Sequence, residues 1–392
     1  MKIKHQFIGL VAAAALLPVS CSKSSPGSSS GQTTTTASGQ FQVQGRFLED
    51  AGGNKVLLRG VDVPIYASGW SNDLTQVAST IAGNTKVNAV RMLWYSSKVF
   101  SQLGNPPYYA SLTNLDNAIS TYLSHHILPV VYLGDLTATY DNTISGFNND
   151  VVPFWTSSDV IAMLKKYNNS LIINLQNEWG ATWDAGSLGT PTGGSDFVNT
   201  YTNLITQLRN AGVTAPIMID APDGGSNSGF LLTNGQALVS GDPLHNVLLS
   251  VHTYWTQENG AIQNCPGDYT TYIDQLKNSN LPFVLGEVSD WAVASDGSEH
   301  NPVDPVDFAC PGAGSPNKYA VNYDAVLTEA VTDQVGFFAW AWYQDGLTVR
   351  NIYNQSAGTS VNTSPDAGSW PGDILSSSKS YGLNNTSITP AL

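Results

Sequence analysis

The chain has 392 residues, of which 42% are hydrophobic and only 12% are charged, and its formal net charge is −14. This length and apolar content are those of a soluble globular protein with one large α/β domain or two smaller ones. The negative charge argues against nucleic acid or an anionic membrane face as a partner.

The first twenty residues have the pattern of an export signal. Two lysines precede an apolar run from Phe7 to Leu17, which is too short to span a bilayer. The run ends in L-P-V-S-C, which resembles the lipobox of bacterial lipoproteins and predicts lipidation of Cys21. Because Pro18 is unusual in that box, plain secretion is the alternative. Acyl chains would anchor the protein to a cell envelope membrane that it never crosses.

Residues 21–40 are rich in Ser, Thr and Gly, and they predict a flexible linker. The pattern changes at Phe41, so we expect the folded domain to span residues 41–392. Phe41–Arg46 and Lys55–Arg59 flank the turn sequence D-A-G-G-N. These segments predict a short β-hairpin that closes one end of the domain.

Strand-like and helix-like segments then alternate. The predicted strands are Val56–Val63, Ala89–Trp94, Ile127–Leu133, Leu171–Glu178, Pro216–Asp220, Val247–Tyr254, Phe283–Val288 and Phe337–Trp342. The predicted helices are Asp73–Ile81, Leu112–Leu123, Val160–Tyr167, Asp196–Ala211, Gly229–Val239, Tyr269–Asn278, Tyr319–Gln334 and Pro371–Ser378. Eight strands, each followed by a helix, predict a (β/α)8 TIM barrel. A doubly wound open sheet is the alternative, but no Gly-rich phosphate loop follows the first strand.

Two of the only six glutamates stand at the ends of apolar strands. Glu178 closes S-L-I-I-N-L-Q-N-E, and Glu287 lies in L-P-F-V-L-G-E-V. A buried carboxylate is costly unless it faces a ligand or a partner. The pair therefore indicates an acid/base site, although each glutamate could instead cap a helix or pair with an arginine. In a barrel the two would face each other across the mouth, as glycoside hydrolysis requires.

Other polar and aromatic residues share this end of the predicted barrel. The strand ends carry Arg91, Trp94, Asp135, Asn177, Asp220, His252, Tyr254, Trp340 and Trp342. His252 and Tyr254 share one strand face, because side chains alternate with period two. Arg91 would supply positive charge near an ionised carboxylate. Trp342 would lie at the rim, where a sugar can stack. Core packing is the alternative for His252 and for the tryptophans.

These motifs, in this order and spacing, resemble glycoside hydrolase family 5. They are A-V-R-M at 89–92, L-Q-N-E-W at 175–179, S-V-H-T-Y at 250–254, L-G-E at 285–287 and A-W-A-W at 339–342. The resemblance implies a retaining (β/α)8 endo-glycanase with Glu178 as acid/base and Glu287 as nucleophile. It further implies sugar binding by Asn177, support of the nucleophile by Arg91 and Tyr254, and a cleavage subsite lined by His252 and Trp342.

Within the family, the stretch from N-E-W to S-V-H-T-Y is most similar to bacterial β-mannanases. The resemblance therefore implies cleavage of internal β-1,4 bonds of a mannan. An endo-β-1,4-glucanase and a catalytically dead glycan-binding lipoprotein are the alternatives. Family members commonly have a histidine at the end of strand three, where this chain has Asp135. Either Asp135 substitutes for it or that contact is absent.

The two cysteines after Cys21 are Cys265 and Cys310, both in loops on the expected active-site side. In an exported protein they are expected to form a disulfide, with two free thiols as the alternative. Calcium is conceivable in the acidic loop 289–317, but no ordered ligand spacing appears there. We therefore expect no metal, no cofactor and a monomer whose partner is a polysaccharide substrate.

Overall fold

The computed structural model describes residues 40–63, 74–102, 111–139, 141–182, 192–253, 268–289, 322–342 and 370–392. These residues belong to one compact unit, Ser38–Leu392. Cys21 and the predicted signal and linker lie outside the described residues. Within the described ranges, every helix is too short or too polar to serve as a membrane span.

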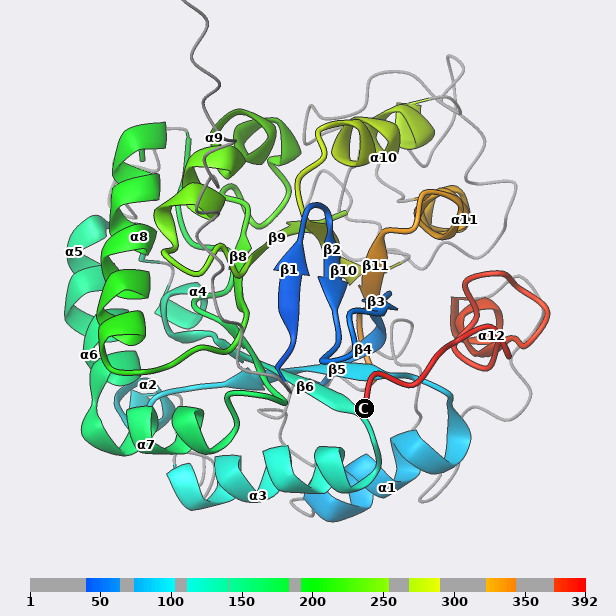
Figure 1. Cartoon of the computed structure of the whole chain (residues 1–392), viewed down its shortest axis with the longest axis horizontal. Helices are drawn as coiled ribbons and strands as arrows, with labels where there is room; N and C mark the ends of the chain where they lie inside the picture. The colour runs from blue at the N-terminus through cyan, green and yellow to red at the C-terminus, as the bar shows by residue number, and fades with distance from the viewer. Residues whose placement is uncertain are drawn as a thin grey trace, which may run out of the picture. The chain divides into compact units, whose positions relative to one another are not determined.

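Eight parallel strands form a closed barrel, which confirms the predicted (β/α)8 fold (Figure 1). Each strand pairs with its neighbours in chain order, and β11 closes the barrel by pairing with β4. The strands are β4 (Arg59–Val63), β5 (Ala89–Trp94), β6 (Leu128–Leu133), β7 (Ile172–Asn174), β8 (Ile217–Asp220), β9 (Val247–His252), β10 (Phe283–Val288) and β11 (Gly336–Ala339).

Helices surround the strands and bury their apolar faces against them. The eight predicted helices correspond to α1 (Leu74–Asn84), α3 (Leu112–Ser124), α7 (Ser158–Lys166), α8 (Gly194–Asn210), α9 (Ser228–Gly241), α10 (Asp268–Asn278), α11 (Tyr323–Thr332) and α12 (Trp370–Leu375). The sequence did not predict α2 (Ser97–Gln102), α4 (Asp135–Thr139), α5 (Ile144–Gly146), the π-helix η2 (Phe147–Val151) and α6 (Val152–Thr156). α2 and α4 are short helices in the connections after β5 and β6, whereas α5, η2 and α6 follow one another without a break over residues 144–156. The π-helical turns in the middle of that segment depart from the 3.6-residue period by which a helix is recognised.

A small antiparallel sheet precedes the barrel and contains one strand more than the predicted hairpin. Its strands are β1 (Gln42–Gln44), β2 (Phe47–Glu49) and β3 (Lys55–Val56), in that order. The extra strand arises because Gly45, with φ of +57°, permits a tight turn between β1 and β2. Apolar residues of this sheet pack with those at the N-terminal ends of the barrel strands. The sheet therefore closes that end of the barrel, as predicted.

The interior of the barrel changes from apolar to polar along the strands. Side chains near the N-terminal ends are apolar and join the small sheet in one cluster: Leu128, Val130, Ile172, Met218, Leu248, Val284 and Phe338. Positions two residues further along several strands are polar and equally buried: Asp62, Arg91, Asn174, Asp220 and Ser250. Period-two alternation keeps these positions on the inner face. The buried polar layer is the floor of the candidate site.

Three predicted strands end earlier than expected. The fourth barrel strand, β7, stops at Asn174 instead of Glu178, because the chain turns sharply there: Glu178 has φ of +51° and Gly180 has φ of +102°. β9 stops at His252, and β11 stops at Ala339. Apolar runs do not mark the point where a buried strand becomes a buried loop. Glu178 and Trp342 therefore lie beyond the ends of their strands, whereas Arg91, Asp220, His252 and Glu287 lie within theirs.

Candidate active site

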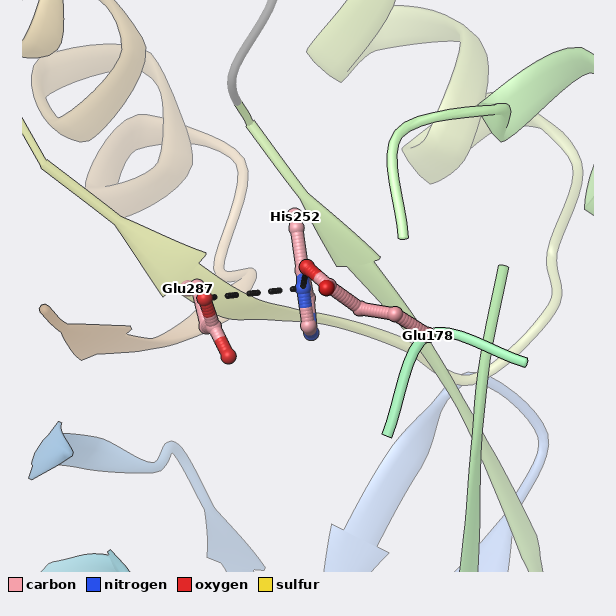
Figure 2. A group of neighbouring side chains, drawn as sticks. All are labelled: Glu178, His252 and Glu287. Atoms are coloured by element: carbon pink, nitrogen blue, oxygen red, sulfur yellow. Dashed lines mark hydrogen bonds and ion pairs between the residues drawn. The ribbon is translucent and has the colours of Figure 1, made fainter. Parts of the chain in front are cut away.

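Glu178 and Glu287 lie close together at the C-terminal end of the barrel, with His252 between them (Figure 2). One carboxylate oxygen of each glutamate and one ring nitrogen of His252 all lie within 4.8 Å of one another. The side chain of Glu178 is 19% exposed, whereas that of Glu287 is 5% exposed. Residues more than a hundred positions apart in sequence thus form one acidic pair, one member of which is more accessible to solvent.

The position of Glu178 is set by the turn that follows β7. The Asn177 amide donates to the Leu133 carbonyl at 2.8 Å, and the Glu178 amide donates to Asp220 Oδ2 at 3.3 Å. Trp179 is buried and stacks on Phe197 with ring centroids 5.7 Å apart. A left-handed conformation is unfavourable for a glutamate, so these contacts hold the residue in a conformation that costs free energy.

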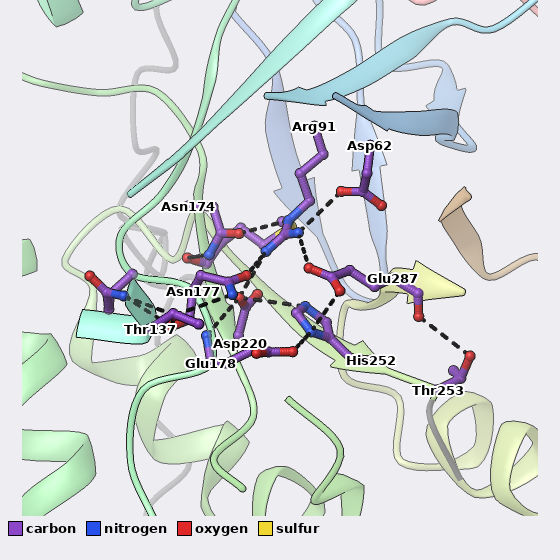
Figure 3. Close-up of polar contacts among 12 residues, drawn as sticks. Asp62, Arg91, Thr137, Asn174, Asn177, Glu178, Asp220, His252, Thr253 and Glu287 are labelled. Atoms are coloured by element: carbon purple, nitrogen blue, oxygen red, sulfur yellow. Dashed lines mark hydrogen bonds and ion pairs between the residues drawn. The ribbon is translucent and has the colours of Figure 1, made fainter. Parts of the chain in front are cut away.

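Arg91 is the centre of the buried polar layer (Figure 3). Its guanidinium is fully buried, and its carbon lies 3.8 Å from the centroid of the Tyr132 ring. Its five hydrogen bonds reach Asn174 Oδ1 at 3.0 Å, Asp62 Oδ1 at 3.1 Å, Glu287 Oε1 at 2.7 Å, Asn177 Oδ1 at 2.6 Å and Asp220 Oδ2 at 3.0 Å. The planar guanidinium donates several hydrogen bonds in fixed directions, so it fixes the positions of several acceptor groups. Arg91 thereby orients the carboxylate of Glu287 within the site.

The carboxylates around Arg91 have opposite pKa shifts. Burial raises the pKa of Asp62 well above its usual value, and the nearby charge of Glu287 adds to the rise, although Arg91 opposes both. Burial would also raise the pKa of Asp220, but the charges of Arg91 and His252 outweigh it and lower the pKa to about 2. Asp220 is therefore ionised at neutral pH, whereas Asp62 binds a proton more readily.

His252 contacts both glutamates and a third carboxylate. Its Nδ1 lies 2.6 Å from Glu178 Oε1 and 3.6 Å from Glu287 Oε2, and its Nε2 lies 3.5 Å from Asp220 Oδ2. Burial favours the neutral ring, but Glu287 and Asp220 outweigh burial and raise the pKa of His252 to about 10. The imidazole is thus a cation at neutral pH, and it bridges the two glutamates.

Two glycines make room for the His252 ring. A Cβ on Gly225, which has φ of +74°, would come within 2.4 Å of the ring, and a Cβ on Gly286 would come within 3.0 Å. Any larger residue at these positions would displace the imidazole. The ring is therefore packed on two sides as well as paired with carboxylates.

Asn177 is fixed by two groups. Its Oδ1 accepts from Arg91, and its Nδ2 lies 3.3 Å from Thr137 Oγ1, which donates to the Asn177 carbonyl at 2.6 Å. Thr137 is on α4, directly after β6. The amide plane of Asn177 is consequently set before any ligand binds, which is a property of a preorganised site.

Asp135 does not face the paired glutamates in its described contacts. It begins α4, is fully buried, and accepts hydrogen bonds from the backbone amide and the hydroxyl of Ser96. Burial raises the pKa of its carboxyl, and the Ser96 bonds act against the rise. Both oxygens are thus occupied in joining the segments after β5 and β6.

The remaining predicted residues contribute less to this geometry. Trp342 is 1% exposed, and its amide donates to the Asp62 carbonyl at 2.9 Å, so it is joined to the site by its backbone. Tyr254, Cys265, Cys310 and the acidic positions of loop 289–317 lie outside the described residues. The roles of these residues stay predictions.

The sequence analysis gave no role to four members of the buried layer: Asp62, Tyr132, Asn174 and Asp220. Three of them are single polar residues inside apolar strand sequences, R-G-V-D-V, L-I-I-N-L and I-M-I-D-A. A polar side chain in the middle of a buried strand requires a partner, and this requirement was the available signal.

Two groups of described residues have the separation of metal ligands: Glu178, His252 and Glu287, and, elsewhere, Asp274, Glu329 and Asp333. In the first group the two glutamates and Asp220 contact the His252 ring, and their charges raise its pKa to about 10. In the second group Lys277 forms ion pairs with Asp274 and Asp333.

A closed parallel barrel with two neighbouring carboxylates at the C-terminal end of its strands is the arrangement of a glycoside hydrolase. The profile of the family described as cellulase (glycosyl hydrolase family 5) matches residues 49–346. The chain belongs to glycosyl hydrolase family 5, which confirms the resemblance seen in its motifs, and it is a glycoside hydrolase.

Several characterised proteins are similar to the chain. It is 26% identical over 356 residues to a mannan endo-1,4-beta-mannosidase of Cellvibrio japonicus, covering 90% of this chain and 69% of that protein. It is 24% identical to a mannan endo-1,4-beta-mannosidase of Salipaludibacillus agaradhaerens, covering 77% and 81%. The catalytic domain of a Streptomyces mannanase has the same fold, with a TM-score of 0.65, 19% identity and coverage of 91% and 95%. The catalytic domain of a Thermobifida fusca endoglucanase gives a TM-score of 0.53, 16% identity and coverage of 81% and 89%.

Proposed function

We propose that the protein hydrolyses internal β-1,4 bonds of β-mannan with retention of configuration. The observation that carries this proposal is the separation of the Glu178 and Glu287 carboxylates, which have oxygens within 4.8 Å of each other. Retaining glycosidases have carboxyl groups about 5–5.5 Å apart, whereas inverting ones require about 6.5–9.5 Å to fit a water. The close approach of the two carboxylates supports the retaining arrangement over the inverting one.

Glu287 is the nucleophile in this scheme. Its carboxylate bonds Arg91 at 2.7 Å, and the guanidinium favours the ionised form that attack requires. One carboxylate oxygen forms a bond to the anomeric carbon as the bond from that carbon to the leaving sugar oxygen breaks. The product of this step is a glycosyl-enzyme ester.

Glu178 is the acid and then the base. It donates its proton to the leaving oxygen in the first step, and it takes a proton from water in the second. That water oxygen bonds to the anomeric carbon and releases Glu287. The greater exposure of Glu178 suits a group that exchanges protons with incoming water. Because the first step requires an ionised nucleophile and a protonated acid, the rate should have a bell-shaped pH profile.

Neighbouring residues would bind the sugar. The preorganised Asn177 amide is proposed to hydrogen-bond the 2-hydroxyl, and its fixed orientation supports this role. His252, Tyr254 and Trp342 are proposed to line the cleavage subsite. Because both Asp135 oxygens already accept from Ser96, we propose that Asp135 does not replace the strand-three histidine of the family.

The choice of mannan is supported by relatives that are named mannan endo-1,4-beta-mannosidases. A β-1,4-glucan is the second candidate, because a beta-mannanase/endoglucanase A of Caldicellulosiruptor saccharolyticus is 28% identical over 195 residues, covering 49% of this chain and 11% of that protein. Release of reducing sugar from galactomannan should exceed release from carboxymethylcellulose. The opposite ratio would favour the glucanase, and binding without any release would favour a glycan-binding protein.

We further propose that residues 1–20 direct export, that Cys21 carries the lipid anchor, that residues 21–40 form a linker and that residues 41–392 are the catalytic domain. The lipobox-like sequence before Cys21 supports the anchor. Cys21→Ser should release the exported protein from membranes into the soluble fraction.

Mass spectrometry without reduction would test the proposed disulfide between Cys265 and Cys310, and size-exclusion chromatography would test whether the protein is a monomer.

A further inference from the structure

One oxygen of Asp220 faces three groups of the site. Asp220 is the last residue of β8 and is fully buried. Its Oδ2 lies 3.0 Å from Arg91 Nη2, 3.3 Å from the backbone nitrogen of Glu178 and 3.5 Å from His252 Nε2 (Figure 3). A single carboxylate therefore contacts the backbone of Glu178 and also the histidine that bonds the Glu178 side chain.

The contact with His252 determines what the opposite ring nitrogen does. When a carboxylate holds one nitrogen of an imidazolium, the other nitrogen also carries a proton and acts as a donor. His252 Nδ1 then donates to Glu178 Oε1 at 2.6 Å. Oε1 is thereby occupied as an acceptor, so the second oxygen, Oε2, is the one that carries a transferable proton. The packing of Gly225 and Gly286 keeps the ring in this orientation.

We propose that Asp220 is a positioning residue for Glu178: it holds His252 with the Nδ1 proton directed at Glu178 and stabilises the left-handed turn that carries Glu178. This inference rests on the proposed acid/base role of Glu178. The effect of Asp220 falls on proton transfer to the leaving group, and Asp220 itself touches no sugar atom in this scheme.

The charges that face His252 come from five elements of the described chain. They are Asp62 on β4, Arg91 on β5, Glu178 after β7, Asp220 on β8 and Glu287 on β10. Four of the five are acidic, so the surroundings favour a cationic ring, in agreement with a pKa of about 10 for His252. Asp220 is the acidic group nearest Nε2, and its removal should lower that pKa most directly.

Asp62 provides a matched control. It is also a fully buried aspartate on a barrel strand, and it also binds Arg91, with its Oδ1 3.1 Å from Nη1. Within the described part of the chain, its side chain bonds neither Glu178 nor His252. Asp62→Asn and Asp220→Asn each remove one carboxylate contact with the same guanidinium at almost constant volume. A difference in activity between the two variants therefore measures the contribution of the contacts that Asp220 makes with His252 and with the backbone of Glu178.

The first test compares kcat/KM for mannohexaose with kcat/KM for an aryl β-mannobioside whose leaving group needs no protonation. Asp220→Asn should lower the first by roughly 100-fold and the second by less than about fivefold, because general acid catalysis is worth about 10²–10⁴. Asp62→Asn should lower both by a similar factor. Equal losses on the two substrates in Asp220→Asn would overturn the inference. A wild type inactive on both would instead refute the proposed function.

The second test does not depend on turnover. The chain has only six histidines, so ¹⁵N-histidine NMR spectra are simple enough to follow His252. In the wild type and in Asp62→Asn, both ring nitrogens of His252 should stay protonated between about pH 5 and 9. In Asp220→Asn the ring should lose a proton within that range. Unchanged protonation in Asp220→Asn would overturn the inference.

A second variant covers the case in which Asp220→Asn does not fold. Asp220→Ser removes the charge but keeps an oxygen that can accept from the Glu178 amide. Unchanged signals from His125 and His245, which lie away from the barrel mouth directly after α3 and before β9, would show that the fold is intact. The same split between substrates is expected for this variant, and equal losses would count against the inference in the same way.

Discussion

The two ends of the barrel are built by the same strands but have opposite chemistry. At the N-terminal end, apolar side chains pack with the small antiparallel sheet in one cluster. At the C-terminal end, Arg91, His252 and four carboxylates form ion pairs with one another, with little exposure to solvent. One end is a hydrophobic core, and the other keeps desolvated charges that oppose one another. The same eight strands thus carry a packed apolar core in one layer and the candidate site in the other.

The comparison predicts that Glu287→Ala abolishes activity and leaves the fold intact. Loss of a nucleophile should reduce kcat on mannan by roughly 10⁴-fold or more. The melting temperature should stay close to that of the wild type. Three carboxylates form ion pairs with Arg91, and two of them remain after the substitution. Reducing-sugar assays and thermal melts would measure the two effects. Glu329→Ala, on α11 and outside the site, should retain full activity; more than about 1% residual activity in Glu287→Ala would argue against the nucleophile role.

A smaller and substrate-dependent loss is expected for Glu178→Ala. Without an acid, kcat/KM should fall by about 10²–10⁴ for mannooligosaccharides, whose leaving oxygen must be protonated. Activated aryl glycosides should lose far less, because their leaving groups depart as anions. Steady-state kinetics on both substrates would measure the difference. Equal loss on the two would contradict the acid role.

The apolar end should show the reverse behaviour. Phe338 is fully buried in the cluster at the closed end and packs against Gly60, where an added Cβ would come within 2.4 Å of its ring. Phe338→Ala should destabilise the protein by about 3–5 kcal/mol, because it leaves a cavity. The folded fraction should keep kcat within about twofold of the wild type. Urea unfolding would measure the stability, with Ile144→Ala, at an exposed site, as the control. A large loss of kcat without destabilisation would break the division between the two ends.

The sequence predicted the apolar end better than the polar end, and the reason is physical. Apolar alternation marks buried strands directly, so all eight barrel strands were predicted. Gly45 was not used as a turn signal, and the third strand of the small sheet was therefore missed. The helical segment 144–156 after β6 was missed because its π-helical middle departs from the 3.6-residue period.

At the polar end, sequence position alone identified Arg91, Asn177, Glu178, His252 and Glu287, and the structure brings these five together. It placed Asp220 at a strand end without a role and did not single out Asp62, because the roles of both depend on contacts with Arg91 and His252 across the barrel. The left-handed turn at Glu178 was also beyond prediction, since it is imposed by tertiary contacts rather than by the local sequence.

A further expected effect is a dependence of stability on pH that arises from the polar end. The pKa of His252 is raised from 6.5 to about 10, so its contribution to stability is full below pH 6.5 and is lost as the pH rises through 10. The raised pKa of Asp62 acts in the same direction. Asp220, with its pKa lowered from 3.8 to about 2, contributes fully above pH 3.8, and its contribution is lost only as the pH falls through 2.

The free energy of unfolding should therefore decline between pH 6.5 and 10, and urea titrations across that window would measure the decline. His252→Gln keeps a hydrogen-bonding side chain without the titration, so the slope should be shallower in that variant. The same slope in both proteins would place the pH dependence outside the site. A shallower slope in His252→Gln would show that the cation between the glutamates, and not the apolar end, links the stability of the barrel to the proton.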